Sequence, residues 1–220
     1  MLRQSIFAFV LSFLIMPTFY TIKSIYENIE NPTQLKKQAT MKIKLLLIIL
    51  SVFATHSAFA KNDEQTQRQF YQTIKSLCGK TFHGKTLFPE DPDHDFAGKT
   101  LAMTLAKCTE QEIRIPFKVG EDTSRTWILS NTDKGLLFKH DHRHADGTPD
   151  EVTMYGGYTN DKGTTLSQSF AADEYTAKLI PEAKTNVWTV YFNQEQTQLF
   201  YYLERHGKPR YKAVFELGGG

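Results

Sequence analysis

The chain has 220 residues, of which 40% are hydrophobic and 23% charged, a balance that excludes collagen-like, coiled-coil and wholly disordered proteins. The formal net charge is +2, but residues 1–60 hold six of the 26 basic residues and two of the 24 acidic ones, which leaves 20 basic and 22 acidic residues in 61–220. Without a positive surplus, the folded part is not expected to have a nucleic-acid partner.

Residues 41–60 have the pattern of a complete secretory signal. Lys42 and Lys44 supply the basic start, residues 45–54 the apolar stretch, and Ala58-Phe59-Ala60 the small-x-small cleavage site. The apolar stretch is too short to span a bilayer. The sequence therefore predicts a Sec-type signal cleaved after Ala60, a periplasmic or secreted product, and no stable membrane insertion of the mature domain.

A second apolar run occupies residues 5–20 and is interrupted by Ser12 and Pro17. Residues 1–40 are accordingly interpreted as a gene-model extension, with translation starting at Met41, or as a membrane anchor ahead of the domain. The extension is favoured because a complete signal with its own methionine needs nothing upstream. Residues 61–220 are predicted to form a single domain.

The mature part begins with a predicted short helix. Apolar residues recur at helical spacing between Asp63 and Leu77, and Gly79 suits a helix C-terminus. Cys78 and Cys108 are the two cysteines of the chain, and two isolated cysteines usually pair in an oxidising compartment. We expect a disulfide that closes a 30-residue loop and contributes about 3–4 kcal/mol. The helix should then lie on the outer face of the fold or across one end.

From Lys80 onward the hydrophobic period changes from 3.6 to 2, which indicates strands. One apolar and one polar face per strand are typical of antiparallel sheets, and turn residues separate the segments. The predicted strands are 81–88, 99–107, 112–119, 125–130, 135–142, 152–158, 164–170, 186–193, 199–205 and 210–217, with a short helix at 172–183. About ten short strands favour an all-β fold, an antiparallel up-and-down β-barrel, with a β-sandwich as the alternative.

Residues 135–144 contain an unusual row of three histidines at every second position. Alternate positions of a strand face one side, so the imidazoles continue a face that carries two large apolar residues. In order, this face carries Leu136, Phe138, His140, His142 and His144. Asp141 and Arg143 are expected to point outward. If the apolar pair faces the core, the histidines line one barrel mouth as neutral, partly desolvated imidazoles.

Neutral imidazole binds borderline metals, so His140, His142 and His144 are candidate ligands for zinc, nickel or copper. Residues i and i+4 of a strand lie about 13 Å apart at Cα, so a further ligand would be needed. Candidates for that ligand are Asp93, His94 and Asp95. The alternatives are a polar lip that orients an amphipathic ligand and a solvated strand end. No catalytic residue is predicted, because the common hydrolase, metalloprotease and phosphate-loop motifs do not occur.

Arg125 and Trp127 alternate onto the face that carries Leu129. An inward arginine in a barrel is suited to holding a carboxylate or a phosphate. An arginine at the start of a strand more commonly extends to water, which is the alternative. The predicted ligand-binding residues are Arg125, Trp127, Phe138, His140 and His142.

Three stretches, Arg114–Trp127, Lys139–Asp150 and Met154–Gly157, resemble a family of exported proteobacterial proteins of uncharacterised activity. The resemblance covers roughly residues 70–217 and implies export and a single domain, but no activity. The strand pattern loosely resembles the calycin group of lipocalin-like barrels, which is a likeness of fold alone. Residues 79–86 have the glycines but not the tryptophan of the usual lipocalin Gly-x-Trp.

A barrel of this strand number encloses either one small ligand or a packed core. The sequence favours a non-enzymatic periplasmic or secreted barrel that binds a small, partly apolar ligand. One alternative is a metal-dependent enzyme or metal-binding protein that uses His140, His142 and His144. Another is a structural envelope protein with a filled interior. The presence of a cavity would distinguish the ligand-binding barrel from the structural protein with a filled interior. The oligomeric state does not follow from the sequence.

Overall fold

The computed structural model describes residues 37, 40–46, 64–160 and 163–218, and the chain divides into two compact units, residues 1–58 and 59–220. In the first unit, residues 40–46 are helical. The predicted anchor at 5–20 and the predicted cleavage site after Ala60 lie outside the described residues. Within the described residues, no helix is both long and apolar enough to cross a membrane.

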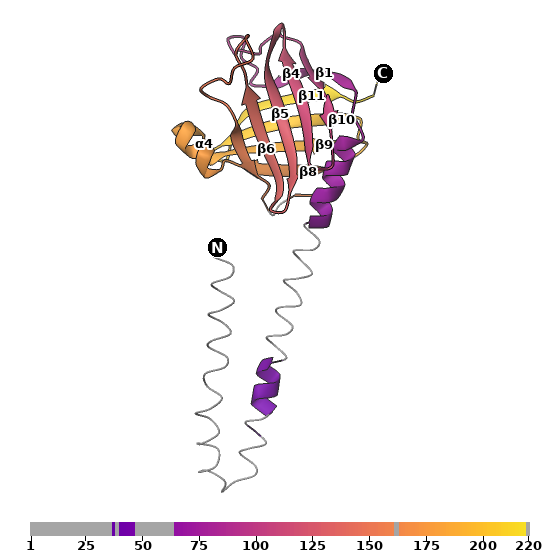
Figure 1. Ribbon diagram of the computed structural model, residues 1–220, viewed down its shortest axis with the longest axis vertical. Coiled ribbons are helices and arrows are strands. Elements are labelled where there is room, and N and C mark those ends of the chain that lie inside the picture. The colour runs from indigo at the N-terminus through magenta and orange to yellow at the C-terminus, as the bar shows by residue number, and fades with distance from the viewer. Residues whose placement is uncertain (1–36, 38–39, 47–63, 161–162, 219–220) are drawn as a thin grey trace. The chain divides into compact units, whose positions relative to one another are not determined.

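The second unit is a nearly closed antiparallel β-barrel (Figure 1). Its strands are β1 (Thr81–Phe88), β2 (Leu101–Thr104), β3 (Lys107–Cys108), β4 (Glu112–Val119), β5 (Asp122–Thr132), β6 (Gly135–His142), β7 (Tyr155–Tyr158), β8 (Ser167–Ala171), β9 (Asn186–Phe192), β10 (Gln198–Arg205) and β11 (Lys208–Glu216). The sheet order is β7-β6-β5-β4-β2-β1-β11-β10-β9-β8, with β3 paired to β4. Apart from the short β3 and the two ends of the sheet, β7 and β8, strands that are consecutive in the chain are neighbours, and β1 pairs with β11, so the predicted up-and-down barrel is confirmed.

Several predicted segments differ from the structure in their bounds: β5 extends beyond the predicted 125–130 at both ends, and β8 begins three residues after the start of the predicted 164–170. Three other differences have a local cause. The expected strand 99–107 is divided into β2 and β3, because Leu105 and Ala106 bond to Lys80 and Arg114 outside the regular ladder. The expected strand 152–158 begins at residue 155, because Met154 has a φ of 56°, which is not an extended conformation. The expected helix 172–183 is divided into α4 (Glu174–Leu179) and the 3-10 helix η1 (Pro181–Thr185), since a residue before proline disfavours helical backbone.

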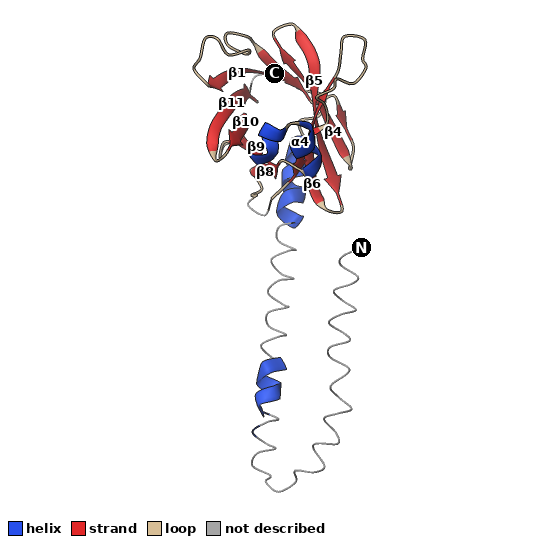
Figure 2. Ribbon diagram, turned by 90° about the vertical axis from the view of Figure 1, so that its left-hand side faces the viewer, coloured by secondary structure: helices blue, strands red, loops and turns tan. Residues whose placement is uncertain are grey.

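The barrel is incompletely paired between β7 and β8, the two ends of the sheet. Just beyond β7, an isolated bridge joins Thr159 to Phe170. Within β7 itself, Gly156 bonds to α4: the Oγ1 of Thr176 accepts a hydrogen bond from the Gly156 N–H at 2.7 Å and donates one to the Gly156 carbonyl at 2.8 Å. Figure 2 shows α4 between β8 and β6, where it covers this opening.

The N-terminal helix spans residues 64–75 and lies across one end of the barrel (Figure 1). Its apolar stripe is fully buried: Phe70 and Tyr71 are 0% exposed and Ile74 is 2% exposed, and all three join the main core. The space left beneath the helix is an apolar void of about 20 Å³, room for no more than a water molecule. The interior at this end is therefore filled.

Cys78 and Cys108 form the predicted disulfide, with their Cα atoms 6.1 Å apart. The bond connects the turn after the N-terminal helix to β3, and thus holds the helix at the barrel end.

We expect the double replacement Cys78→Ala and Cys108→Ala to lower the free energy of unfolding by about 3–4 kcal/mol. The reason is that the unfolded chain regains the entropy of a loop of 30 residues. Urea unfolding of the oxidised protein and the variant measures the difference. A loss below about 1 kcal/mol would show that the bond constrains the unfolded chain much less than its loop length implies.

Candidate functional site

The barrel end opposite the N-terminal helix contains a cavity of about 570 Å³. Its walls come from inward residues near the ends of β4, β5, β6, β10 and β11, and from the segment that joins β1 to β2. Aromatic residues contribute much of the lining, beside charged and imidazole side chains, and they include Phe96, Phe117, Trp127, Tyr155, Tyr201 and Tyr211. This volume lies in the range of about 300–1,000 Å³ that is typical of small-molecule sites.

Four of the five predicted ligand-binding residues line this cavity: Arg125, Trp127, His140 and His142. β5 and β6 are paired so that Arg125 lies opposite His142, and Trp127 lies opposite His140. Phe138 lies deeper, where it lines the small apolar void and packs against the His140 ring with centroids 4.9 Å apart. The two-residue alternation therefore locates the site, and Phe138 belongs to the core below it.

Aromatic rings from three strands form a continuous stack in the cavity wall. The Trp127 ring lies between Phe117 and Tyr201, at centroid distances of 4.5 Å and 4.7 Å and interplanar angles of 21° and 4°. Sequence reasoning did not assign Phe117 or Tyr201 to the site. Their inward positions follow from strand alternation, but their proximity to Trp127 depends on how distant strands are placed.

His140 is buried at the floor of the cavity and is 3% exposed. Its Nδ1 lies 3.2 Å from the Tyr155 carbonyl oxygen, and its Nε2 lies 2.9 Å from the Tyr201 hydroxyl. Because a carbonyl only accepts, Nδ1 carries the proton and Nε2 accepts from Tyr201. Burial, opposed by the Tyr155 carbonyl and aided by the charges of His142 and Lys139, lowers the pKa of His140 to about 3. The imidazole is therefore neutral at pH 7, with both nitrogens engaged.

The depressed pKa of His140 makes the fold sensitive to acid. The unfolded state has the ordinary pKa of 6.5, so it binds a proton first as the pH falls, and stability is lost from pH 6.5 downward to about pH 3. As the pH falls from 7 to 5, the protonation of His140 in the unfolded state should lower the free energy of unfolding by about 2 kcal/mol. Urea unfolding of the wild type and His140→Gln at both pH values measures the effect, since glutamine keeps an acceptor but does not titrate. Equal pH dependence in the two proteins would contradict it.

His142 lies above His140 and is half-buried. Its Nε2 is 3.0 Å from the Tyr155 hydroxyl. Burial, followed by the charge of Arg125, lowers the pKa of His142, while burial raises the pKa of Tyr155 to about 12. Both groups are thus neutral at pH 7, and when Tyr155 donates to Nε2, the proton of His142 is on Nδ1. Among the described residues, Nδ1 has no hydrogen-bond partner.

His144 lies outside the cavity, with a side chain that is 46% exposed and 3.7 Å from a Glu151 carboxylate oxygen. In the described part of the chain, the set of three residues whose ligand atoms lie within 4.8 Å of one another is His144, Asp150 and Glu151, and it is on the surface. The structure therefore does not bring His140, His142 and His144 to one point. Of the three further ligands considered, His94 and Asp95 line the cavity.

Arg125 lies at the cavity rim with a side chain that is 23% exposed. Its Nη1 forms an ion pair with Asp122 and lies 3.4 Å from the Ser124 hydroxyl, and its Cζ is 5.3 Å from the centre of the Phe96 ring. Burial would raise the pKa of Asp122, but hydrogen bonds from Ser124 and Arg125 outweigh it and lower the pKa to about 2. Arg125 is thus held on one side by a carboxylate and on its face by a ring.

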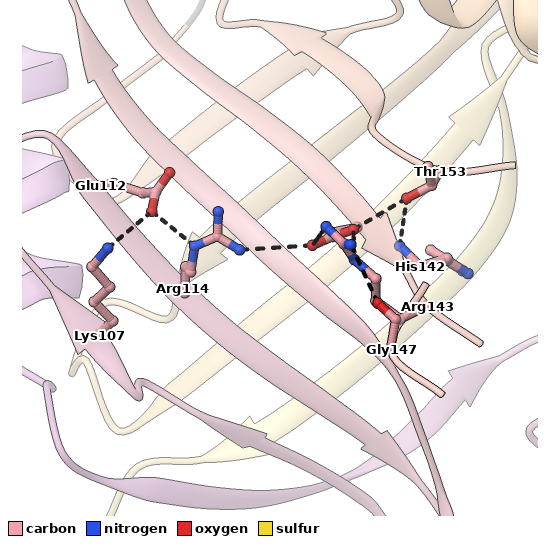
Figure 3. Close-up of polar contacts among 8 residues, drawn as sticks. Lys107, Glu112, Arg114, His142, Arg143, Gly147 and Thr153 are labelled. Carbon is pink, nitrogen blue, oxygen red and sulfur yellow. Dashed lines mark hydrogen bonds and ion pairs between the residues drawn. The ribbon is translucent and has the colours of Figure 1, made fainter. Parts of the chain in front are cut away.

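A polar network on the outer face of β6 fixes the backbone of His142 (Figure 3). Asp141 points outward as predicted, but it is 3% exposed because arginines cover it. Arg143 contacts both carboxylate oxygens, at 2.8 Å and 3.2 Å, and Arg114 lies 3.7 Å away. The Thr153 hydroxyl donates to Asp141 at 3.2 Å and accepts from the His142 N–H at 2.7 Å. The network therefore holds the end of β6 in place behind the cavity.

Comparison of the chain with protein-family models, with curated proteins and with solved structures finds no match. The function is therefore argued from the cavity itself.

Proposed function

We propose that the protein binds a small, partly apolar ligand in the cavity at the open end of the barrel and is not an enzyme. The observation that carries this proposal is the cavity of about 570 Å³, whose lining combines aromatic rings with charged and imidazole side chains. Ligand sites are concave and mostly apolar, with a small number of placed polar groups that orient the ligand. The packed interior near the N-terminal helix supplies a rigid floor for such a site.

The electrostatics of the wall support binding in preference to acid–base catalysis. Burial lowers the pKa of His140 to about 3 and raises the pKa of Tyr155 to about 12, and it raises the pKa of Tyr201 well above the ordinary value. General acids and bases work best with pKa values near the working pH. These three groups instead stay neutral and fix one another by hydrogen bonds.

We also propose that the protein is exported to the periplasm or secreted. The predicted signal at 41–60 supports this location, and so does the disulfide between Cys78 and Cys108, because such bonds persist in oxidising compartments.

A neutral fluorescent naphthalene, N-phenyl-1-naphthylamine, tests the binding proposal. We expect one saturable site per chain, and we expect Leu203→Trp to weaken binding by about tenfold or more, because Leu203 lines the cavity and an indole would fill part of it. Leu166→Trp is the matched control, since Leu166 also packs on the core but lines a separate surface groove. Unsaturable binding, or equal affinity of the wild type and Leu203→Trp, would overturn the proposal.

A further inference from the structure

The charged residues that line the cavity differ in how deeply they are buried. The acidic lining residues Asp91 and Asp95 are exposed, and so is the second lining arginine, Arg210. Arg125 is the more buried cation, and its charge acts on three wall groups. Burial raises the pKa values of Tyr155 and Tyr211 and the Arg125 charge opposes that rise, whereas burial and then the Arg125 charge both lower the pKa of His142. The wall groups deeper than Arg125 are neutral at pH 7. A ligand that reaches the deeper part of the cavity therefore meets one partly buried cation, Arg125, above an uncharged floor.

The guanidinium of Arg125 has an unused edge. Its contacts to Asp122 and Ser124 both use Nη1, and the Phe96 ring covers one face. Among the described residues, Nε and Nη2 have no hydrogen-bond partner. These two N–H groups form one of the edges that pairs with a carboxylate through two parallel hydrogen bonds. Asp122 is 44% exposed, so water screens its charge from a second anion.

A second donor lies beside this edge. Arg125 and His142 are opposite each other in the pairing of β5 with β6. When Tyr155 donates to Nε2 of His142, the Nδ1–H of His142 is available to a ligand, as described above. Tyr201 offers no proton, because its hydroxyl donates to His140. Arg125 and His142 thus place two donors side by side on neighbouring strands of the cavity wall.

The stacked rings of the cavity wall favour a ligand whose remaining part is apolar. Both faces of Trp127 are covered by Phe117 and Tyr201, so the ring can present only its edge to the cavity. Ring edges carry partial positive charge and prefer the electron-rich face of another aromatic system. Tyr211 adds a further ring, which is stacked with His94 at 5.5 Å. Such a surface suits a flat conjugated body better than a flexible chain.

We propose that the cavity selects flat aromatic carboxylates, with the carboxylate on the Nε–Nη2 edge of Arg125 and near His142, and the ring system against the edge of Trp127. This inference rests on the proposed function and names the class of ligand for the same site. The carboxylate gains two charge-assisted hydrogen bonds that a neutral ligand of equal shape does not.

Calorimetric titration with 2-naphthoate and its neutral isostere 2-naphthamide tests the inference. The wild type should bind the carboxylate about 10- to 100-fold more tightly, which is the effect expected for hydrogen bonds between charged groups. Arg125→Gln should abolish this preference while 2-naphthamide and N-phenyl-1-naphthylamine still bind. Arg125→Lys, which keeps the charge but not the fork, should retain only part of it. Arg68→Gln is the control and should keep the full preference, since Arg68 is an exposed arginine that lines a separate surface groove.

The outcomes separate the two proposals. Equal affinities for the carboxylate and the amide in the wild type, or an equal loss of both in Arg125→Gln, would overturn the inference and leave the neutral-probe site intact. Failure of all three naphthalenes to bind the wild type would overturn the proposed function as well. Circular dichroism spectra of each variant that match the wild type confirm that a change in preference is not a loss of fold.

Discussion

Replacing Phe70 by alanine should lower the free energy of unfolding by about 3–5 kcal/mol. The Phe70 ring is 0% exposed and packs edge-on against Phe192 with centroids 6.0 Å apart. Its removal would enlarge the apolar void that already lies beneath the helix, and the barrel walls around that void are held by strand pairing and cannot collapse into it. Guanidinium unfolding followed by circular dichroism measures the change.

Gln69→Ala is the matched control, because Gln69 is the preceding residue of the same helix and is exposed. Alanine is the better helix former, so this change should alter stability by less than about 0.5 kcal/mol. The disulfide still anchors the helix at Cys78 in the Phe70→Ala variant, so the loss reports packing rather than detachment. A loss below about 1 kcal/mol for Phe70→Ala would mean that the helix covers the barrel end without filling it.

Strand alternation made much of the fold predictable. In β4 the buried positions are Ile113, Ile115, Phe117 and Val119, which are those of the apolar face in the sequence. The same alternation placed Arg125, Trp127, His140 and His142 on the inner face of two strands joined by a tight turn, so their register is fixed locally. These four residues therefore meet in the cavity as a direct consequence of sequence spacing.

The rest of the site depends on long-range pairing that no local pattern encodes. Tyr201 hydrogen-bonds His140 from 61 residues away, and it reaches that position because β10 lies across the barrel from β6. The segment between β1 and β2 contributes Phe96, which packs on Phe117 and Tyr211 as the segment folds over the mouth. A turn-rich segment gives no periodic signal, so its position over the cavity could not be predicted.

The burial of Asp141 shows a second limit of alternation. An outward position on a strand predicts exposure to water, and Asp141 occupies such a position. Arg143 lies two residues further along the same strand face, and Arg114 belongs to the next strand but one, so their side chains converge over the carboxylate. The alternation gives the direction of a side chain, whereas its exposure depends on which long neighbours lie across it.

The seam between β7 and β8 depends on a glycine pair, because backbone approaches backbone there without room for side chains. A Cβ on Gly157 would lie 1.8 Å from the Ala171 carbonyl oxygen and 3.0 Å from the Asp173 nitrogen. Asp173 also donates its N–H to the Gly156 carbonyl at 2.9 Å, so the contact that a methyl group would break is one that closes the barrel. Neither neighbour is a side chain that could turn away.

Gly157→Ala should therefore lower the free energy of unfolding by more than about 4 kcal/mol, above the usual cost of overpacking, because the clash is with backbone and only strand separation relieves it. Amide exchange should rise first in β7, β8 and α4, while β4 and β5 stay protected, because their pairing does not cross the seam. Gly218→Ala is the control, since a Cβ there meets no atom within 4 Å. If Gly157→Ala had the same melting temperature and the same amide exchange as the wild type, the barrel would tolerate an open seam.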